Sequence, residues 1–263
     1  MSPDRVAQMV DHLVTNWDIK ELQIEDDNFT VNPKRVIEIC ERIKHHGLRM
    51  TMPNAMRADA PINRDKRKKM LAAMKDAGWE QIGLGVEHGD RKFLNEVIGK
   101  RLNLDEVVAT TDMAQDVGLL VHCNFMMGFP HETQANRQKT VDFAMSLNAD
   151  SYSLSLATPL PGTDMWDIIE KDQLFTETFS HDRGLPSLVS IKPDDIGEQE
   201  LFDFVEKVNR DLNIKASNRR QAAKEKYSLF EGKTAVGDRK YLGKMAEPEI
   251  IKTSAQVAVR KLP

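Results

Sequence analysis

The feature that most constrains the fold of this chain is a two-residue alternation that returns in segment after segment. In at least four of five predicted strands, apolar residues occupy one face and small or polar residues the other. Successive side chains of a strand point to opposite faces, so the small and polar residues share one surface. This surface carries Glu21, Gln23 and Glu25; Gly83, Gly85 and Glu87; His122, Asn124 and Met126; and Ser151, Ser153 and Ser155. An open parallel sheet covered by helices on both sides is apolar on both faces, so the pattern favours a barrel interior that is open to a ligand.

A helix-like segment follows each predicted strand, which indicates a parallel sheet in an α/β fold. Apolar spacing and punctuation by Gly and Pro set the expected bounds. We expect strands at 20–25, 48–53, 80–87, 119–127 and 151–157, and helices at 3–16, 33–45, 64–77, 90–97, 104–117, 133–147, 164–172 and 195–215.

The strand-and-helix rhythm breaks after Pro161-Gly162. We therefore expect two parts, a partial barrel over residues 1–170 and a C-terminal helical extension with a basic tail over 171–263. From Ile214 onward the chain has 12 Lys or Arg against 5 Asp or Glu. A tail of this kind can bind phosphate or an acidic partner, but a solvated tail is the simpler interpretation.

Composition excludes several classes of function. A net charge of −4 gives no support for nucleic-acid binding. No apolar run approaches 18 residues and no basic-plus-apolar leader opens the chain, which predicts a cytoplasmic protein without a membrane span. The two cysteines, Cys40 and Cys123, lie far apart without metal-ligand spacing and are expected to be buried small hydrophobes.

Short polar motifs stand where the predicted strands end, and ligands of (β/α) barrels bind at the carboxyl ends of the strands. The ends read Glu25-Asp26-Asp27-Asn28-Phe29-Thr30, Asn54-Ala55-Met56-Arg57-Ala58-Asp59, Gly85-Val86-Glu87-His88-Gly89, Met127-Gly128-Phe129-Pro130-His131-Glu132-Thr133, and Thr158-Pro159-Leu160-Pro161-Gly162-Thr163. In this order they resemble the radical S-adenosylmethionine (SAM) enzymes, and most of all the branch with cobalamin-dependent members and methylthiotransferase-like proteins. The resemblance covers about residues 1–170.

The resemblance implies a partial (β/α)6 TIM-like barrel whose first strand and cluster loop are missing. In that family a CxxxCxxC loop holds a [4Fe-4S] cluster, which reduces SAM to a deoxyadenosyl radical. Fe–S clusters need thiolate ligands, and two cysteines cannot supply three. The resemblance therefore implies a fragment that is inactive alone, with a split partner or natural loss as alternatives. Cobalamin is a possible second cofactor, although its usual N-terminal domain has no counterpart here.

The segment Glu25-Asp26-Asp27-Asn28 matches the family segment that binds the methionyl ammonium of SAM. Carboxylates form charge-assisted hydrogen bonds with a cation. A divalent metal would satisfy the same three carboxylates, and a solvated acidic loop with Asp27 and Asn28 as turn residues is the structural alternative.

Arg57 lies where the family often places a basic group near the methionine carboxylate or the substrate, and its guanidinium suits a carboxylate. A salt bridge to Asp59 or Asp27 is the structural alternative. Glu87 resembles the family's polar residue near the ribose hydroxyls, beside space that Gly83 and Gly85 leave open. A buried structural glutamate is the alternative.

The segment Gly128-Phe129-Pro130 resembles the family segment whose backbone meets adenine. Asn124 and Met126 face inward just before it, and Asn124 either binds the nucleoside or satisfies backbone groups in the interior. His122 is expected to be a core histidine, and His88 a loop residue on the other face. No residue of this chain is assigned as a ligand of the iron–sulfur cluster.

Three hypotheses follow from these residues. The first is a radical SAM enzyme core that cleaves SAM or transfers a methyl group, acting on a small-molecule or unknown substrate. The second is a non-catalytic barrel that binds a nucleoside or a partner chain. A partner chain would complete the barrel by pairing with an unpaired strand edge. The third is a lyase or hydrolase whose divalent metal is held by Glu25, Asp26, Asp27 and Glu87.

Overall fold

The computed structural model describes residues 1–60, 63–177, 179 and 189–231 of the chain. The strands are β1 (Glu21–Gln23), β2 (Arg49–Thr51), β3 (Gln81–Glu87), β4 (Leu120–Met127) and β5 (Ser151–Leu156). The helices are α1 (Pro3–Trp17), α2 (Pro33–Ile43), α3 (Arg64–Asp76), α4 (Leu104–Asp116), α5 (Gln134–Ser146), α6 (Asp164–Asp172) and α7 (Glu198–Glu231), with short 3-10 turns η1 (Phe29–Val31) and η2 (Lys44–His46) and a π-helix η3 (Phe93–Val97).

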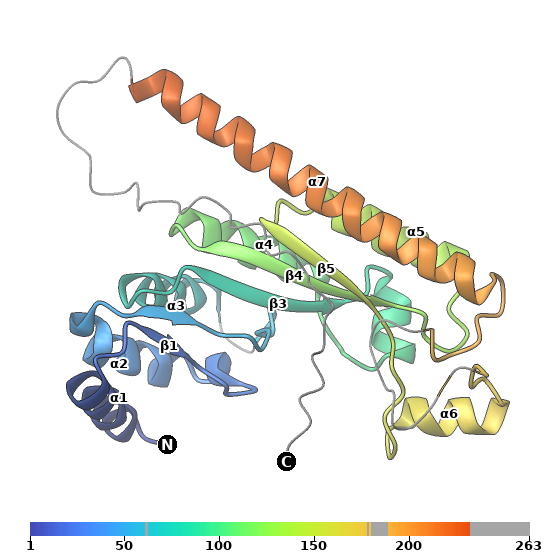
Figure 1. Cartoon of the computed structure of the whole chain (residues 1–263), viewed down its shortest axis with the longest axis horizontal. Helices are drawn as coiled ribbons and strands as arrows, with labels where there is room; N and C mark the ends of the chain where they lie inside the picture. The colour runs from blue at the N-terminus through green and yellow to red at the C-terminus, as the bar shows by residue number, and fades with distance from the viewer. Residues whose placement is uncertain (61–62, 178, 180–188, 232–263) are drawn as a thin grey trace, which may run out of the picture. The chain divides into compact units, whose positions relative to one another are not determined.

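All five strands run parallel in the order of the sequence. β1 pairs with β2, and β3, β4 and β5 form a second ladder. Two isolated parallel bridges, Met50 with Trp79 and Met56 with Leu84, join the two ladders. The result is an α/β fold with strands and helices in alternation, as Figure 1 shows, and the predicted partial barrel is confirmed.

The predicted alternation of faces is present in the strands. In β4 every second residue is buried, and β5 repeats the pattern. Register places His122 opposite Ser151 and Asn124 opposite Ser153, so the half-exposed polar residues of neighbouring strands lie side by side. The buried set, which includes Val121, Cys123 and Phe125, belongs to the main hydrophobic core.

The first strand is shorter than the predicted 20–25. Ile24 still donates its N–H to Thr51 at 2.9 Å, but Glu25 lies outside the strand. The chain turns because the Asp26 carboxylate accepts the backbone N–H of Asn28 at 2.9 Å. Such a side-chain bond replaces a strand partner with a local turn.

The helix starts follow the predicted signals. Ser2 caps α1 with Pro3 in the first turn, and Asn32 caps α2 with Pro33 in the same position. Their side chains accept backbone N–H groups that have no partner inside the helix. The predicted short helix at 90–97 is present over residues 91–97, and its larger part is the π-helix η3 (Phe93–Val97).

Helix α7 begins after the predicted boundary at residue 170 and lies against β5 (Figure 1). Its buried face carries Leu201, Val205, Val208 and Leu212, which join the main core. The compact unit that contains the sheet runs from Met1 to Gln221, and a second unit holds Ala222–Pro263. The predicted basic tail beyond residue 231 falls outside the described residues.

Within the described ranges, no helix combines the length and apolar character that a membrane crossing requires.

Candidate functional site

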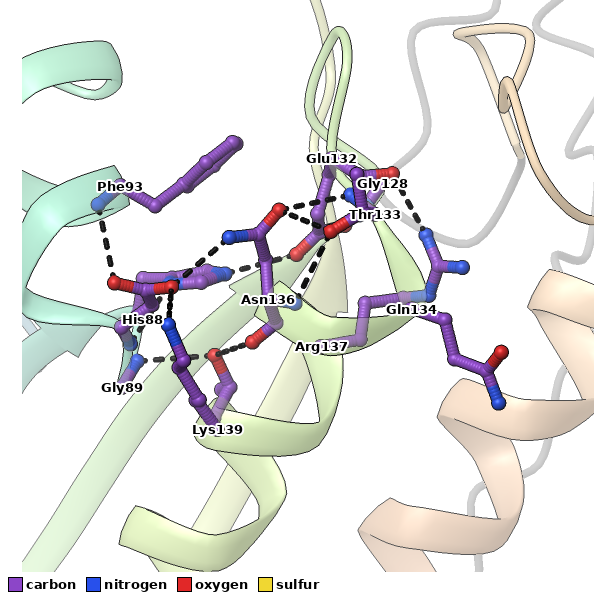
Figure 2. Close-up of polar contacts among 12 residues, drawn as sticks. His88, Gly89, Phe93, Gly128, Glu132, Thr133, Gln134, Asn136, Arg137 and Lys139 are labelled. Atoms are coloured by element: carbon purple, nitrogen blue, oxygen red, sulfur yellow. Dashed lines mark hydrogen bonds and ion pairs between the residues drawn. The ribbon is translucent and has the colours of Figure 1, made fainter.

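Two loops meet at the carboxyl ends of β3 and β4 and form a dense polar network (Figure 2). One loop begins at His88 directly after β3, and the other begins at Gly128 directly after β4. Gly89 packs so closely on α5 that an added Cβ would lie 2.6 Å from the Thr140 Cα. The two loops are therefore held together through α5.

Glu132 is the centre of this network, and its side chain is almost fully buried. One carboxylate oxygen accepts the backbone N–H of Gly128 at 2.6 Å, and the other contacts His88 Nε2 at 2.9 Å. His88 Nδ1 accepts the Asp90 N–H at 3.0 Å, so the ring proton is on Nε2 and donates to Glu132. Gly128 has a φ of 80°, a conformation that glycine adopts without strain.

Asp90 links the first loop to α5. Its carboxylate accepts the backbone N–H of Lys92 at 2.9 Å and of Phe93 at 3.3 Å. The other oxygen accepts from Asn136 at 2.9 Å and pairs with Lys139 at 2.7 Å. Burial works to raise the pKa of Asp90, but these hydrogen bonds outweigh it and hold that pKa well below its ordinary value.

His131 occupies the tip of the second loop, with a φ of 59°. Its Nδ1 lies 2.9 Å from an Asp194 oxygen, and its Nε2 lies 3.0 Å from an Asp172 oxygen. The hydrogen bonds to these two carboxylates raise the pKa of His131. The histidine therefore ties the loop both to the end of α6 and to the segment before α7.

The predicted ammonium-binding residues Glu25, Asp26, Asp27 and Asn28 are all exposed and make separate contacts. Glu25 accepts a hydrogen bond from Gln23. Asp26 closes the turn described above, with Arg35 3.8 Å away. Asp27 accepts from Asn54 at 3.2 Å, which joins the carboxyl ends of β1 and β2.

Arg57 and Glu87 both contact Lys100, a residue that the sequence analysis did not single out. Arg57 pairs with Asp59 at 2.6 Å and donates to the Lys100 carbonyl at 2.8 Å, so the predicted alternative of a structural salt bridge is present. Glu87 pairs with the Lys100 ammonium. A Cβ on Gly85 would lie 3.0 Å from the Glu87 carboxylate and 3.1 Å from Lys100 Nζ. These two side chains therefore fill the position beside Gly85, and the prediction that it stays open is wrong.

The polar face of β4 and β5 carries a second hydrogen-bond network. His122 contacts Ser151 at 2.8 Å, Asn124 at 3.1 Å and Ser153 at 3.2 Å, and Ser153 donates to Asn124 at 2.6 Å. Desolvation by burial lowers the pKa of His122. The hydrogen bonds of the His122 ring are thus satisfied, but His122 is half-buried on the polar face of the sheet and, contrary to the prediction, does not lie in the buried core. Met126 lies on the same face.

The cysteines of this chain do not fit an iron–sulfur cluster. Cys40 on α2 and Cys123 on β4 are fully buried in the apolar core, as predicted. Burial raises the pKa of each thiol to about 12, whereas a cluster ligand must be a thiolate. Any cluster ligands would have to come from outside these 263 residues.

The family model of the radical SAM superfamily matches residues 1–144. The chain belongs to the radical SAM superfamily. The matched range contains β1 to β4 and the loops that carry the predicted ammonium, ribose and adenine contacts. The resemblance found in the strand ends is thereby confirmed, while the roles of the individual residues stay predictions.

Several curated relatives are similar to this chain over most of its length. An uncharacterized methyltransferase of Pyrococcus horikoshii is 33% identical over 166 residues, which are 63% of this chain and 35% of that protein. The cytidylyl-2-hydroxyethylphosphonate methyltransferase of Streptomyces wedmorensis is 25% identical over 80% of this chain and 40% of its own. An anaerobic magnesium-protoporphyrin IX monomethyl ester cyclase of Rubrivivax gelatinosus is 24% identical over 77% of this chain and 35% of its own. The chain thus spans well under half the length of these relatives.

Solved structures show the same fold. The radical SAM methyltransferase TsrM from Kitasatospora setae superposes with a TM-score of 0.55 at 19% identity, over 72% of this chain and 37% of that chain. Coproporphyrinogen III oxidase from Escherichia coli superposes with a TM-score of 0.52 at 15% identity, over 78% and 45% of the two chains. Both likenesses concern the fold of the barrel.

Sequence reasoning missed the residues that organise the two loops. His88 and Glu132 are both buried and bonded to each other, whereas the sequence indicated a loop residue at His88 and placed Glu132 directly before the helix expected at 133–147. A buried carboxylate requires hydrogen-bond donors, and its burial is not visible in a loop motif. The motif Gly-Phe-Pro-His-Glu-Thr did contain one usable signal, since Thr133 is the N-cap of α5, which leaves Glu132 outside the helix.

Proposed function

We propose that this chain is the SAM-binding barrel of a radical SAM enzyme that transfers a methyl group or cleaves SAM, with cobalamin as a possible second cofactor. The observation that carries the proposal is the match of the superfamily model over residues 1–144, which ends after the loop at Gly128. Three of the similar curated proteins are named as methyltransferases. Two similar structures contain cobalamin, one together with SAM and the other together with a [4Fe-4S] cluster.

When bound together, SAM and a reduced cluster supply radical chemistry, and the protein binds and orients the reactants. Asp27 with Asn54 would receive the methionyl ammonium at the ends of β1 and β2. Glu87 would accept hydrogen bonds from the ribose hydroxyls, with Lys100 holding its carboxylate in place. The backbone after Gly128 would meet adenine, and Glu132 fixes that backbone by accepting the Gly128 N–H. The chain's own thiols take no part, so we expect no reductive cleavage by this polypeptide alone.

Binding of SAM to the purified chain tests the proposal without a cluster. Saturation-transfer NMR at millimolar SAM should show transfer from the protein to the adenine and ribose protons. Glu87→Gln should lower SAM affinity by about 10-fold because the ribose loses a charge-assisted acceptor. Glu21→Gln is the matched control, since Glu21 is an exposed strand residue paired with Arg49. No transfer at millimolar SAM, or equal loss in both variants, would contradict the proposal.

The divalent-metal alternative has no support in the described residues. There, a single group has three His, Cys, Asp or Glu ligand atoms within 4.8 Å of one another, and it contains neither the acidic loop nor Glu87. Asp27 is bonded to Asn54 and Glu87 to Lys100. These carboxylates therefore have partners other than a metal ion.

A further inference from the structure

That single group of potential metal ligands lies away from the carboxyl ends of the strands. It consists of Asp11 on α1 with His45 and His46 in the turn η2. The turn η2 comes directly before β2 (Arg49–Thr51), so it stands at the amino end of that strand. The proposed SAM contacts belong to the carboxyl ends, and the two regions are separate in the fold.

The geometry of the three side chains suits one small ion. Their ligand atoms all lie within 4.8 Å of one another. His46 Nε2 is 2.6 Å from an Asp11 oxygen, and the rings of His45 and His46 have centroids 3.9 Å apart. Atoms that surround one ion at the usual Zn–N and Zn–O distances of about 2.0–2.2 Å are separated by roughly 3–4 Å. A small shift of side chains would place all three on one ion.

The neighbouring cations leave this group free for a metal. Arg42 is paired with Asp4 at 3.1 Å, and Lys44 is paired with Glu41 at 2.6 Å. In the described ranges, the ion-pair partner of Asp11 is His46 alone. The His46 side chain is 13% exposed and that of Asp11 is 54% exposed, so the group is anchored on one side and open to solvent on the other.

We propose that Asp11, His45 and His46 bind a divalent transition-metal ion of the zinc class. Two imidazoles and a carboxylate are ligands that Zn²⁺, Co²⁺ and Ni²⁺ accept, and water completes the coordination. Calcium and magnesium are disfavoured because they take oxygen ligands. The ion would join α1 to the turn after α2 and so stabilise the folded chain by mass action. This site is independent of the proposed function.

Titration of the tag-free chain with Co²⁺ and Zn²⁺ tests the proposal. Visible absorption should show d–d bands that saturate at one equivalent of Co²⁺, and calorimetry should give one Zn²⁺ per chain. Substitutions outside the ligand shell already lower metal affinity by about 10–100-fold. His46→Gln and Asp11→Asn, which remove ligands, should therefore lower Zn²⁺ affinity by about 100-fold or more.

His12→Gln is the matched control, because His12 neighbours Asp11 but bonds to Asn16 within α1. This variant should keep the affinity of the unaltered chain. Circular dichroism in the absence of metal confirms that each variant is folded, and His45→Gln repeats the test if one of the others is not. Absence of saturable Co²⁺ bands, or Zn²⁺ binding that survives loss of His46 and Asp11, would overturn the proposal.

Discussion

Glu132→Gln changes one atom of the network between the loops after β3 and β4. The structure predicts how much this substitution lowers the free energy of unfolding. The Glu132 carboxylate faces two donors, the Gly128 N–H at 2.6 Å and His88 Nε2 at 2.9 Å. A glutamine offers one acceptor oxygen and one NH₂ group. His88 cannot change tautomer to help, because its Nδ1 accepts the Asp90 N–H. The glutamine NH₂ group must therefore face a donor.

The magnitude follows from the burial of the pair. His88 and Glu132 side chains are 0% and 1% exposed, so water does not replace the lost acceptor. A buried donor left without a partner costs about 1–3 kcal/mol, and hydrogen bonds to charged groups lie at the upper end. We expect Glu132→Gln to lower the free energy of unfolding by about 2–3 kcal/mol at neutral pH.

Urea unfolding followed by circular dichroism measures this change. Glu96→Gln is the control, since Glu96 is exposed with Lys92 3.9 Å away, and it should stay within about 0.5 kcal/mol. In a His88→Leu background, the cost of Glu132→Gln should fall by about 1 kcal/mol because one of the two donors is gone. A cost below 0.5 kcal/mol, or no coupling between the two positions, would refute the reasoning.

Two further predictions concern contacts with the segments after β5. His131 has a raised pKa in the folded chain. The stability that it contributes is therefore fully present below its unfolded pKa of about 6.5 and is lost as the pH rises through the folded pKa. Urea unfolding should show that the unaltered chain is more stable than His131→Gln by up to about 1 kcal/mol at pH 5.5, a limit set by the half-exposed site, and by less at pH 8.5. An equal difference at both pH values would contradict it. Asn213→Ala removes the side chain that bonds the Tyr152 N–H at 3.1 Å and its carbonyl at 3.0 Å, and should cost about 1–3 kcal/mol in the same assay, whereas Gln199→Ala on the exposed face of α7 should cost less than 0.5 kcal/mol.

The fold could be predicted from the sequence because its signals are local. Alternation of faces in β4 and β5 is set by neighbouring residues, and the caps at Ser2 and Asn32 act within a single turn. Such signals give the strands, the helices and their parallel order. The family resemblance depended on the same property, since its motifs stand at fixed places after each strand.

The site could be predicted less completely because its contacts join distant parts of the chain. Glu132 meets His88 across 44 positions, and Glu87 meets Lys100 from a loop without a motif. The segment at 25–28 reads as one acidic cluster, yet a turn at Asp26 sends its carboxylates to different partners. Side-chain contacts between two loops depend on how the strands bring the loops together, so a local sequence pattern does not predict them.

The edge of β5 limits how a partner chain could extend this sheet. Asn209 and Asn213 of α7 bond the backbone of Leu154 and Tyr152, which are the groups that a neighbouring strand would use. A strand added there would have to displace a helix whose apolar face lies in the core. Within the described residues, β1 has β2 as its one strand neighbour. A partner chain that completes the barrel, which the sequence led us to consider, would therefore have to pair with β1, and Asn213→Ala should leave such pairing unchanged while it weakens the β5 edge.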